Sequence, residues 1–307
     1  MTNIFIDGSA GTTGLRIYDR LSIRKDINLI ILPDDIRKDI NARREAINKA
    51  DIAFLCLPDV AAIEAVSLVK NPNTVIIDTS TAHRTTEGWA YGFPELNGYR
   101  EKIHNSKRIA NPGCHASGFV ALVAPLIENG MLKQDANLSA FSLTGYSGGG
   151  KGMIAQYEDI EKDVLLGAPR QYALTQNHKH LKEMVKICGL DKAPVFCPIV
   201  ADYYSGMEVT VPIFSSDIKA SVSEIKEFYK EYYKQGLISY KDSENEEGFL
   251  SAAALSGKDN MEITVSGNNE RILLVARFDN LGKGASGAAI QNMNVVLGLD
   301  EKTGLEI

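Results

Sequence analysis

The stretch Ile4–Leu21, IFIDGSAGTTGLRIYDRL, joins a short apolar strand to a helix through a glycine-rich turn. Its glycines, Gly8, Gly11 and Gly14, recur at every third position. Glycines permit a tight turn and the close approach of a pyrophosphate, which the N–H groups and the dipole of the following helix stabilise. The stretch therefore predicts a dinucleotide-binding turn, with a merely structural strand–helix turn as the alternative.

The first third of the chain continues this alternation of strands and helices. Apolar runs such as INLIIL (residues 27–32) and IAFLCL (residues 52–57) are nearly continuous and are separated by helical patterns. Such runs are typical of parallel strands that are buried on both faces and joined by crossover helices. We expect an α/β fold that begins with a doubly wound Rossmann-type dinucleotide domain.

The pattern changes after Cys114, where alternating runs begin at Glu208, Met261 and Arg271. Alternation favours half-buried antiparallel strands. Between them, Ser221–Gly236 predicts an amphipathic helix that begins with a Ser221/Glu224 capping box and ends at Gly236. We therefore expect an α+β catalytic and oligomerisation domain with a mainly antiparallel sheet over residues 114–283, and a dinucleotide domain over residues 1–113 plus about 284–307.

Composition narrows the functional class. The 307 residues carry a formal net charge of −6. The sequence has no cluster of basic residues interleaved with aromatic residues, so we do not expect it to bind nucleic acid. No apolar run reaches about 18 residues and no targeting segment is recognisable, so we expect a cytoplasmic protein that does not bind membranes. The four cysteines have no C-x-x-C spacing, and we expect neither a metal site nor disulfides. The polar run Lys241–Gly248 predicts an exposed loop.

The choice between NAD and NADP stays open at this stage. Asp34 lies 20 residues after Gly14 and is placed to accept a hydrogen bond from a ribose 2′-hydroxyl, which favours NAD. Arg37 and Lys38 follow closely and are suited to a 2′-phosphate, which favours NADP. Ser9, Thr12 and Thr13 add hydroxyl donors to the turn.

Cys114 follows an Asn-Pro-Gly turn and precedes an apolar helical run in IANPGCHASGFVALVAPLI, Ile109–Ile127. A helix N-terminus favours the thiolate and supplies N–H donors for an oxyanion. Cysteine is also often a buried packing residue, and this is the expected role of Cys56. We interpret Cys114 as a nucleophile because it occurs beside a predicted nicotinamide site.

A thiol nucleophile needs a proton carrier, and His178 and His180 are the candidates that spacing alone does not separate. His180 has Glu183 three residues later, which can orient it. Arg84 follows a predicted buried strand, where ligands bind in doubly wound folds, and is a candidate phosphate or carboxylate clamp. The second glycine-rich turn, Gly145–Met153, is either a flexible connection or an anion-binding loop that uses its N–H groups and Lys151.

Taken together, these motifs resemble the N-acetyl-γ-glutamyl-phosphate reductase family of arginine biosynthesis, within the aspartate-semialdehyde dehydrogenase superfamily. The resemblance covers nearly the whole chain and rests on GSAGTTG, DTSTAHR with YGFPEL, NPGCHAS, TGYSGGGKGM, HKHLKEM and DNLGKGASGAAIQNMN. The chain is similar to the shorter of two family forms. One departure is His115, where longer members tend to carry tyrosine.

The resemblance implies NADP(H), a cysteine thioester, a homodimer or homotetramer, and reduction of N-acetylglutamyl 5-phosphate to its semialdehyde. It implies Cys114 as nucleophile and His180 as general acid and base. The implied substrate-binding residues are Arg84, Asn111, Tyr146, Ser147 and Gly148. The implied cofactor-binding residues are Gly8, Ser9, Gly11, Thr12, Thr13, Gly14, Arg37, Ser80, Asn280 and Gln291.

Two other hypotheses remain. One is a sister semialdehyde dehydrogenase that acts on aspartyl phosphate, although PGCHAS and HKHLKEM resemble that branch less. The other is a non-catalytic NADP-binding regulator, which the presence of both Cys114 and His180 disfavours.

Overall fold

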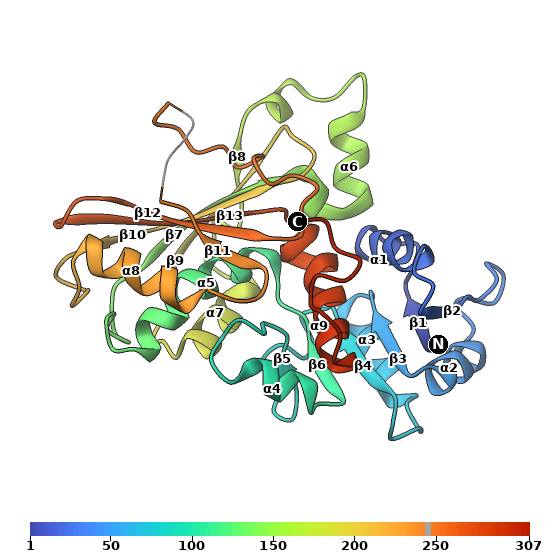
Figure 1. Ribbon diagram of the computed structural model, residues 1–307. Helices are drawn as coiled ribbons and strands as arrows, with labels where there is room; N and C mark the ends of the chain where they lie inside the picture. Colours follow the sequence, from blue (N-terminus) through green and yellow to red (C-terminus); the bar gives the residue numbers. More distant parts are fainter. Residues whose placement is uncertain (243–246) are drawn as a thin grey trace. The chain divides into compact units, whose positions relative to one another are not determined.

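The computed structural model describes residues 1–242 and 247–307, so Ser243–Glu246 of the predicted polar loop lie outside the described residues. The chain divides into two compact units (Figure 1). Unit 1 comprises Met1–Pro112 and Ala285–Leu305, and unit 2 comprises Gly113–Gly284 and Glu306–Ile307. Within the described part of the chain, no helix is long and apolar enough to cross a membrane.

Unit 1 contains a six-stranded sheet in the order β2-β1-β3-β4-β6-β5, and its strand pairs are all parallel. The strands are β1 (Thr2–Asp7), β2 (Ile27–Ile30), β3 (Ile52–Leu55), β4 (Val75–Asp78), β5 (Ala90–Tyr91) and β6 (Arg108–Ala110). The helices are α1 (Thr12–Ser22), α2 (Ile40–Lys49), α3 (Asp59–Ser67), α4 (Tyr99–His104) and α9 (Gly287–Leu297). The predicted doubly wound parallel domain is confirmed.

Both faces of this sheet are covered, as the continuous apolar runs predicted. Ile52 and Phe54 of β3 pack in one core cluster with side chains of α1, α4 and α9, whereas Ala53 and Leu55 pack in a second cluster with α2 and α3. Successive residues of a strand point to opposite faces, so a strand that is covered on both faces is nearly continuously apolar. Cys56 follows β3, is half-buried and packs against the first cluster.

Unit 2 contains a seven-stranded mixed sheet in the order β11-β12-β13-β10-β7-β9-β8. The strands are β7 (Ser139–Gly145), β8 (Arg170–Gln171), β9 (Val195–Ala201), β10 (Met207–Phe214), β11 (Ile238–Tyr240), β12 (Met261–Gly267) and β13 (Arg271–Phe278). Four strand pairs are antiparallel, while β7–β9 and β11–β12 are parallel. The prediction of a mainly antiparallel sheet is confirmed.

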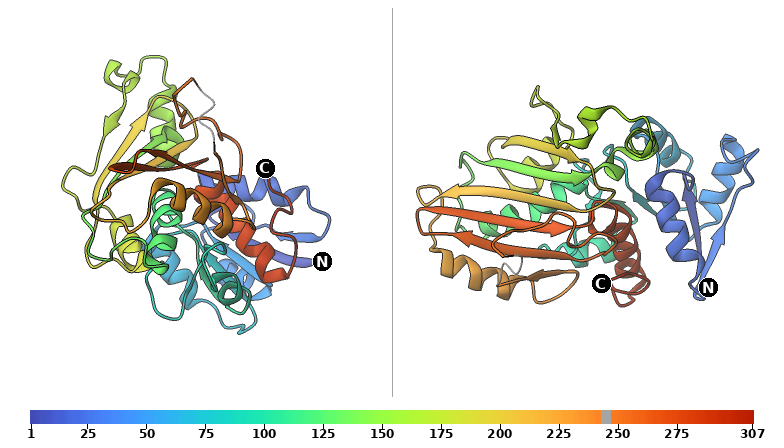
Figure 2. Two further views of the ribbon diagram at one scale, coloured as in Figure 1. Left: turned by 60° about the vertical axis from the view of Figure 1, so that its left-hand side comes forward. Right: turned by 90° about the horizontal axis from the view of Figure 1, so that it is seen from above.

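Helices α5 (Cys114–Glu128), α7 (His180–Cys188) and α8 (Val222–Tyr232) lie on one side of this sheet, as Figures 1 and 2 show, and α6 spans Gly150–Glu158. Helix α5 approaches the sheet so closely that a Cβ atom on Gly118 would lie 2.6 Å from Cγ2 of Val209. Every residue from His115 to Ile127 is buried. Cys114, which is half-buried, stands at the start of this helix.

Helix α8 begins with the predicted capping box of Ser221 and Glu224 but ends earlier than predicted. Its last helical residue is Tyr232, and the hydroxyl of Tyr233 donates to the carbonyl of Ala121 in α5 at 2.7 Å. This tertiary contact holds the chain at the helix end, and Gly236, with φ of +89°, serves the turn that follows.

Alanine in place of Gly14 tests the tight contact between α1 and its turn. A Cβ atom there would lie 2.4 Å from the carbonyl oxygen of Gly8. Because backbone cannot move aside cheaply, we expect a loss of about 1–3 kcal/mol in the free energy of unfolding, measured by urea titration with circular dichroism. The matched control is Gly152→Ala in α6, where a Cβ meets no atom within 4 Å. Equal unfolding midpoints for the two variants would contradict the proposed close contact.

Candidate functional site

The glycine turn of unit 1 has the geometry of a phosphate-binding turn. Gly8 has φ of +89°, and a Cβ atom there would lie 2.3 Å from the carbonyl oxygen of Cys56. Gly11 donates its N–H to the carbonyl of Gly8 at 3.0 Å and is the N-cap of α1. Gly8 and Gly14 therefore cannot carry a side chain, and the turn brings its backbone to the N-terminus of a helix.

Thr12 provides an independent indication that this turn holds a ligand. Its Oγ1 atom is buried and has no hydrogen-bond partner among the residues that the structure describes. Leaving such a hydroxyl unpaired costs about 1–3 kcal/mol, a cost that a ligand oxygen at the head of α1 would relieve. The half-buried Ser9 and Thr13 flank the same turn. These residues fit a dinucleotide phosphate.

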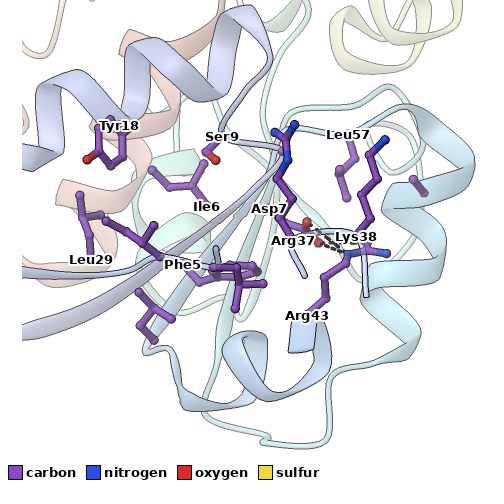
Figure 3. A pocket seen from close by; sticks show the side chains of 15 residues that line it. Phe5, Ile6, Asp7, Ser9, Tyr18, Leu29, Arg37, Lys38, Arg43 and Leu57 are labelled. Atoms are coloured by element: carbon purple, nitrogen blue, oxygen red, sulfur yellow. Dashed lines mark hydrogen bonds and ion pairs between the residues drawn. The ribbon is translucent and has the colours of Figure 1, made fainter. Parts of the chain in front are cut away.

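A pocket of about 310 Å³ opens beside this turn in unit 1 (Figure 3). Its walls include apolar side chains of β1 and β2 together with Ser9, Arg37 and Lys38. Asp34, the residue that would favour NAD, has a side chain 96% exposed and forms an ion pair with Arg37 at 3.3 Å. Arg37 and Lys38 thus line the pocket, and the Asp34 carboxylate faces solvent.

Sequence analysis did not identify Asp7 and Arg43, which also line the pocket. Asp7 ends β1 and accepts from Nε and Nη2 of Arg43 at 3.0–3.3 Å, while Nη1 of Arg43 donates to Glu64 at 2.9 Å. Burial raises the pKa of Asp7, and the Arg43 guanidinium opposes that rise. The two residues are 36 positions apart in the sequence, so no local sequence pattern predicts their pairing.

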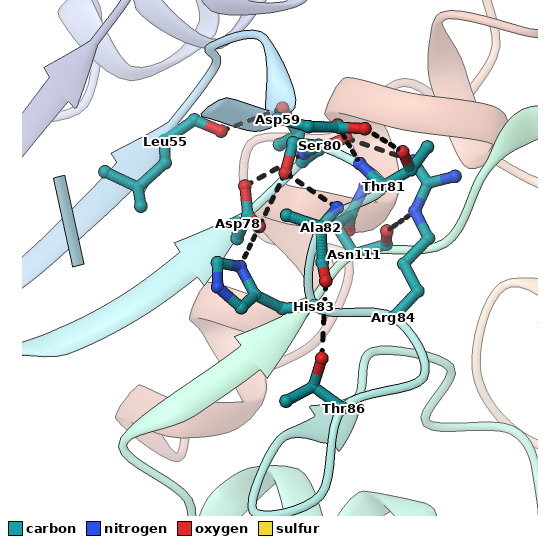
Figure 4. A network of polar contacts seen from close by, with 11 residues as sticks. Leu55, Asp59, Asp78, Ser80, Thr81, Ala82, His83, Arg84, Thr86 and Asn111 are labelled. Carbon is teal, nitrogen blue, oxygen red and sulfur yellow. Dashed lines mark hydrogen bonds and ion pairs between the residues drawn. The ribbon is translucent and has the colours of Figure 1, made fainter. Parts of the chain in front are cut away.

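The loop after β4 is organised around Asp78 (Figure 4). Its carboxylate accepts from the N–H and hydroxyl of Ser80 and contacts Nδ1 of His83 at 2.6 Å. The His83 ring stacks on Trp89 at 4.0 Å between centroids. The Ser80 hydroxyl donates to Asp78 at 2.7 Å and supports this loop, and its predicted role in cofactor binding stays a prediction.

This loop presents Arg84, which is buried and held by backbone carbonyls. Its Nε donates to the carbonyl of Asn111 at 2.9 Å and its Nη2 donates to that of Thr79 at 3.0 Å. Asn111 is itself fixed, since its side-chain nitrogen donates to Ala285 at 2.9 Å and its side-chain oxygen accepts from Asn292 at 3.1 Å. Arg84 and Asn111 therefore form one rigid polar group within unit 1, which is drawn in Figure 4.

Cys114 begins α5 in unit 2, which confirms its predicted place at a helix N-terminus. The preceding residue, Gly113, is the N-cap and donates its N–H to the buried carboxylate of Glu183 at 2.8 Å. Behind the cysteine, a Cβ atom on Gly284 would lie 3.0 Å from the Cβ of Cys114. The expectation that Glu183 orients His180 stays a prediction, and the observed role of Glu183 is to fix the turn that carries Cys114.

Two other imidazoles and one phenol gather around His115, the residue that follows Cys114. The His115, His178 and His180 rings lie 4.7–5.8 Å apart between centroids, and the Tyr172 ring lies 6.0 Å from His115. His180 is buried as the first residue of α7, and its N–H donates to Nδ1 of His178 at 3.2 Å. Tyr172 was not among the predicted site residues, although it lies only six residues before His178 in the sequence.

His115 differs from the other two histidines because its ring is fully enclosed. Nδ1 is hydrogen-bonded to Oγ of Ser142 at 2.7 Å and Nε2 to the hydroxyl of Tyr172 at 2.6 Å. Burial lowers the pKa of His115 to about 3, and the neighbouring His178 contributes. His115 is therefore a neutral imidazole in the folded protein at ordinary pH.

Burial raises the pKa of two of the other thiols. Burial raises the pKa of Cys56 to about 12, and burial also raises the pKa of Cys188. A thiol that stays protonated is a poor nucleophile. Within the described ranges, no group of three or more His, Cys, Asp or Glu side chains is arranged so that it could hold a metal ion.

The second glycine-rich turn is anchored, which corrects the idea of a flexible connection. The N–H groups of Tyr146 and Ser147 donate to the carbonyls of Tyr203 and Tyr204 at 2.9 and 3.0 Å. These two N–H groups are therefore not available to an anion, contrary to one expectation for this loop. Gly148 follows them and is exposed.

Asn280 and Gln291, both predicted to bind the cofactor, are engaged elsewhere. Asn280 lies in unit 2, where its amide donates to Oγ of Ser147 at 2.9 Å and accepts from Gly206 at 2.9 Å. Gln291 is fully buried in unit 1 and donates to Glu95 and Glu301 at 2.8 Å each. Asn280 thus supports the turn predicted to bind substrate, and their cofactor roles stay predictions.

Two family models match the chain and together cover most of it. The semialdehyde dehydrogenase NAD-binding domain matches residues 34–106, and the semialdehyde dehydrogenase dimerisation domain matches residues 114–280. Among solved structures, aspartate semialdehyde dehydrogenase II of Vibrio cholerae complexed with ASA has a TM-score of 0.72 at 15% identity, covering 97% of this chain and 98% of that one. The enzyme of Candida albicans with NADP has a TM-score of 0.69 at 14% identity, covering 97% and 99%. These likenesses show the fold.

Curated relatives are much closer in sequence. An N-acetyl-γ-glutamyl-phosphate reductase of Trichormus variabilis is 46% identical over 98% of both chains. One of Brucella ovis is 45% identical over 96% of this chain and 98% of the relative. With this identity over nearly its full length, the protein belongs to the N-acetyl-γ-glutamyl-phosphate reductase family of semialdehyde dehydrogenases.

Proposed function

We propose that this protein reduces N-acetylglutamyl 5-phosphate to N-acetylglutamate 5-semialdehyde with NADPH, through a thioester on Cys114. The observation that carries the proposal is the half-buried Cys114 at the head of α5, beside a cluster of three imidazoles, in a chain that matches named reductases over nearly its full length. A regulator without catalysis would not need this combination.

The first half of the reaction is nucleophilic. The Cys114 thiolate attacks the acyl carbon, the carbon–oxygen bond to phosphate breaks, and a thioester remains on the sulfur. The N-terminus of α5 stabilises the oxyanion that forms beside the sulfur. Arg84 and the Asn111 turn are suited to the leaving phosphate, because their fixed geometry provides a planar cationic donor. Tyr146, Ser147 and Gly148 are the proposed contacts for the rest of the substrate.

The second half is reductive. When bound, the dinucleotide supplies the hydride that reduces the thioester. His180 protonates the resulting oxygen and takes that proton back as the carbon–sulfur bond breaks and the aldehyde leaves. Because a productive cysteine must be a reduced thiol, the chemistry also supports a cytoplasmic location.

Charge at the pocket of unit 1 supports NADP over NAD. Arg37 and Lys38 line the pocket, whereas the Asp34 carboxylate is solvent-exposed and paired with Arg37. A 2′-phosphate would find two cations there, and a 2′-hydroxyl would find no fixed acceptor in Asp34. Gly8, Ser9, Gly11, Thr12, Thr13 and Gly14 are proposed to hold the pyrophosphate.

The open face of the unit 2 sheet supports a homo-oligomer. Phe141 of β7 and Leu273 of β13 point away from the helices and are 43% and 41% exposed. Strand β10 lies between these two strands, and its Pro212 pairs with Leu273. Figure 2 shows the strands of this face without a helix across their centre. An apolar sheet face of this kind is suited to a second copy in a two-fold dimer.

The covalent route predicts that Cys114→Ser loses at least about 1,000-fold in kcat for phosphate-dependent oxidation of N-acetylglutamate semialdehyde, because the serine hydroxyl stays protonated. NADP binding, measured by fluorescence titration, should remain near that of the wild type. The matched control is Cys56→Ser, whose thiol takes no part. Aspartate semialdehyde should be a poor substrate for the wild type; a preference for it would place the enzyme in the sister branch.

Cofactor choice is tested by replacing Arg37 and Lys38 together with serine. We expect KM for NADP to rise about 10–100-fold with little change for NAD, because each lost cation removes a charge-assisted contact to the 2′-phosphate. Lys49→Ser, which removes one positive charge from an exposed position of α2, is the control. If Asp34→Asn instead weakened NAD binding and the double variant left NADP unaffected, the assignment would be reversed.

Oligomerisation is tested by Phe141→Glu, which places a charge on the open sheet face. The expected result is a shift toward monomers in analytical ultracentrifugation at micromolar concentration, since a buried unpaired carboxylate opposes association. Val60→Glu, at an exposed apolar position of α3 in unit 1, should leave the oligomer intact. An unchanged mass for Phe141→Glu would exclude this face as the interface.

A further inference from the structure

His115, directly after the nucleophile, joins the core of unit 2 to the edge of the proposed site. Its ring is only 3% exposed, and each ring nitrogen has a hydroxyl partner: Ser142 on β7 at 2.7 Å and Tyr172 at 2.6 Å. The ring also packs edge-on against Phe196 of β9. The proposed mechanism uses none of these three polar groups.

A neutral imidazole has one N–H donor and one acceptor nitrogen, so only two arrangements of this chain are possible. In one, Ser142 donates to Nδ1 and Nε2 donates to the Tyr172 oxygen. In the other, Tyr172 donates to Nε2 and Nδ1 donates to Ser142. The two arrangements differ in which hydroxyl keeps a free hydrogen.

Burial decides between them. Ser142 is 0% exposed, and among the described residues its hydroxyl has His115 as its hydrogen-bond partner. If Ser142 accepted, its own hydrogen would be enclosed in the core without an acceptor, which is unfavourable. Tyr172 is partly exposed, so its hydrogen can be received by a ligand or a charged group. The first arrangement is therefore the stable one.

The Tyr172 hydroxyl lies within electrostatic reach of negative charge on Cys114. Burial raises the pKa of Tyr172, and the charge of the Cys114 thiolate raises it further, so the two groups are within electrostatic reach. The backbone is held as well, because the N–H of Tyr172 donates to the carbonyl of Pro198 at 3.0 Å. The other titratable groups around the His115 ring are His178 and His180, at 5.8 and 5.6 Å.

We propose that His115 is a positioning residue: with Ser142 it forms a one-way hydrogen-bond relay that turns the Tyr172 hydroxyl into a donor to negative charge at Cys114. The phenol O–H of Tyr172, whose raised pKa keeps it protonated, stabilises the thiolate before attack and the oxyanion after it. The assignment rests on the proposed function for its catalytic consequence. The direction of the relay does not depend on the substrate.

A double-mutant cycle tests whether His115 acts through Tyr172. We expect His115→Phe and Tyr172→Phe each to lower kcat/KM for the semialdehyde about tenfold, and the double variant to fall no further, because both remove the same donor. His115→Gln, which retains a donor and an acceptor, should keep activity within about threefold of the wild type. A roughly hundredfold loss in the double variant, or full activity in His115→Phe, would overturn the relay.

Two measurements need no substrate and separate this inference from the proposed function. Alkylation of Cys114 by iodoacetamide, followed by peptide mass spectrometry, should shift its pH midpoint upward by about half a unit to one unit in Tyr172→Phe and equally in His115→Phe. In the wild-type protein, ¹⁵N spectra should show His115 as the Nε2–H tautomer between pH 5 and 9. An Nδ1–H tautomer would refute the relay even if the enzyme proved active. An inactive wild type with both expected signals would refute only the proposed function.

Discussion

The burial of α5 is the constraint on which the chemistry of unit 2 depends. Thirteen consecutive residues, His115–Ile127, are enclosed between the sheet and the helices α7 and α8. The close approach at Gly118 and the hydroxyls of Tyr229 and Tyr233, which donate to carbonyls of α5, leave the helix no freedom to slide. Its first residue, Cys114, is the point at which the buried helix meets accessible space. The core therefore fixes the sulfur by packing, and the Glu183 carboxylate fixes the turn before it.

In unit 1, the side chains at the carboxyl ends of the strands are positioned by hydrogen bonds and not by the packing of a buried helix. There, charged and polar groups are tied to backbone: Asp78 holds Ser80 and His83, and Arg84 is held by the carbonyls of Thr79 and Asn111. These two backbone hydrogen bonds hold the Arg84 guanidinium in one orientation. At the glycine turn, the buried Thr12 hydroxyl has no hydrogen-bond partner among the residues that the structure describes, so it is available to a ligand.

Local sequence was sufficient wherever local physics determines the structure. Periodicity predicted the doubly covered sheet, and the Pro-Gly turn before an apolar run placed Cys114 at a helix N-terminus, because capping and strand burial are short-range properties. Local sequence did not predict contacts between residues that are far apart in the chain. The Asp7–Arg43 pair and the Ser142–His115–Tyr172 chain join residues 27 to 57 positions apart, and the early end of α8 reflects a contact 112 residues away. Ser80, Asn280 and Gln291 show the converse: residues in a matched motif whose polar atoms are engaged in support of other groups.

A neutral relay beside the nucleophile has an electrostatic advantage over a charged one. An imidazolium at position 115 would attract the thiolate strongly, but its desolvation inside the core would be unfavourable, and its charge would vary with pH. A pKa of about 3 removes both problems, since His115 stays neutral throughout the range in which Cys114 must ionise. The stabilising dipole then comes from the Tyr172 hydroxyl, whose raised pKa keeps its proton in place. In the proposed mechanism proton transfer is assigned to His180, so the tasks of orienting a donor and of moving a proton are divided between neighbouring imidazoles.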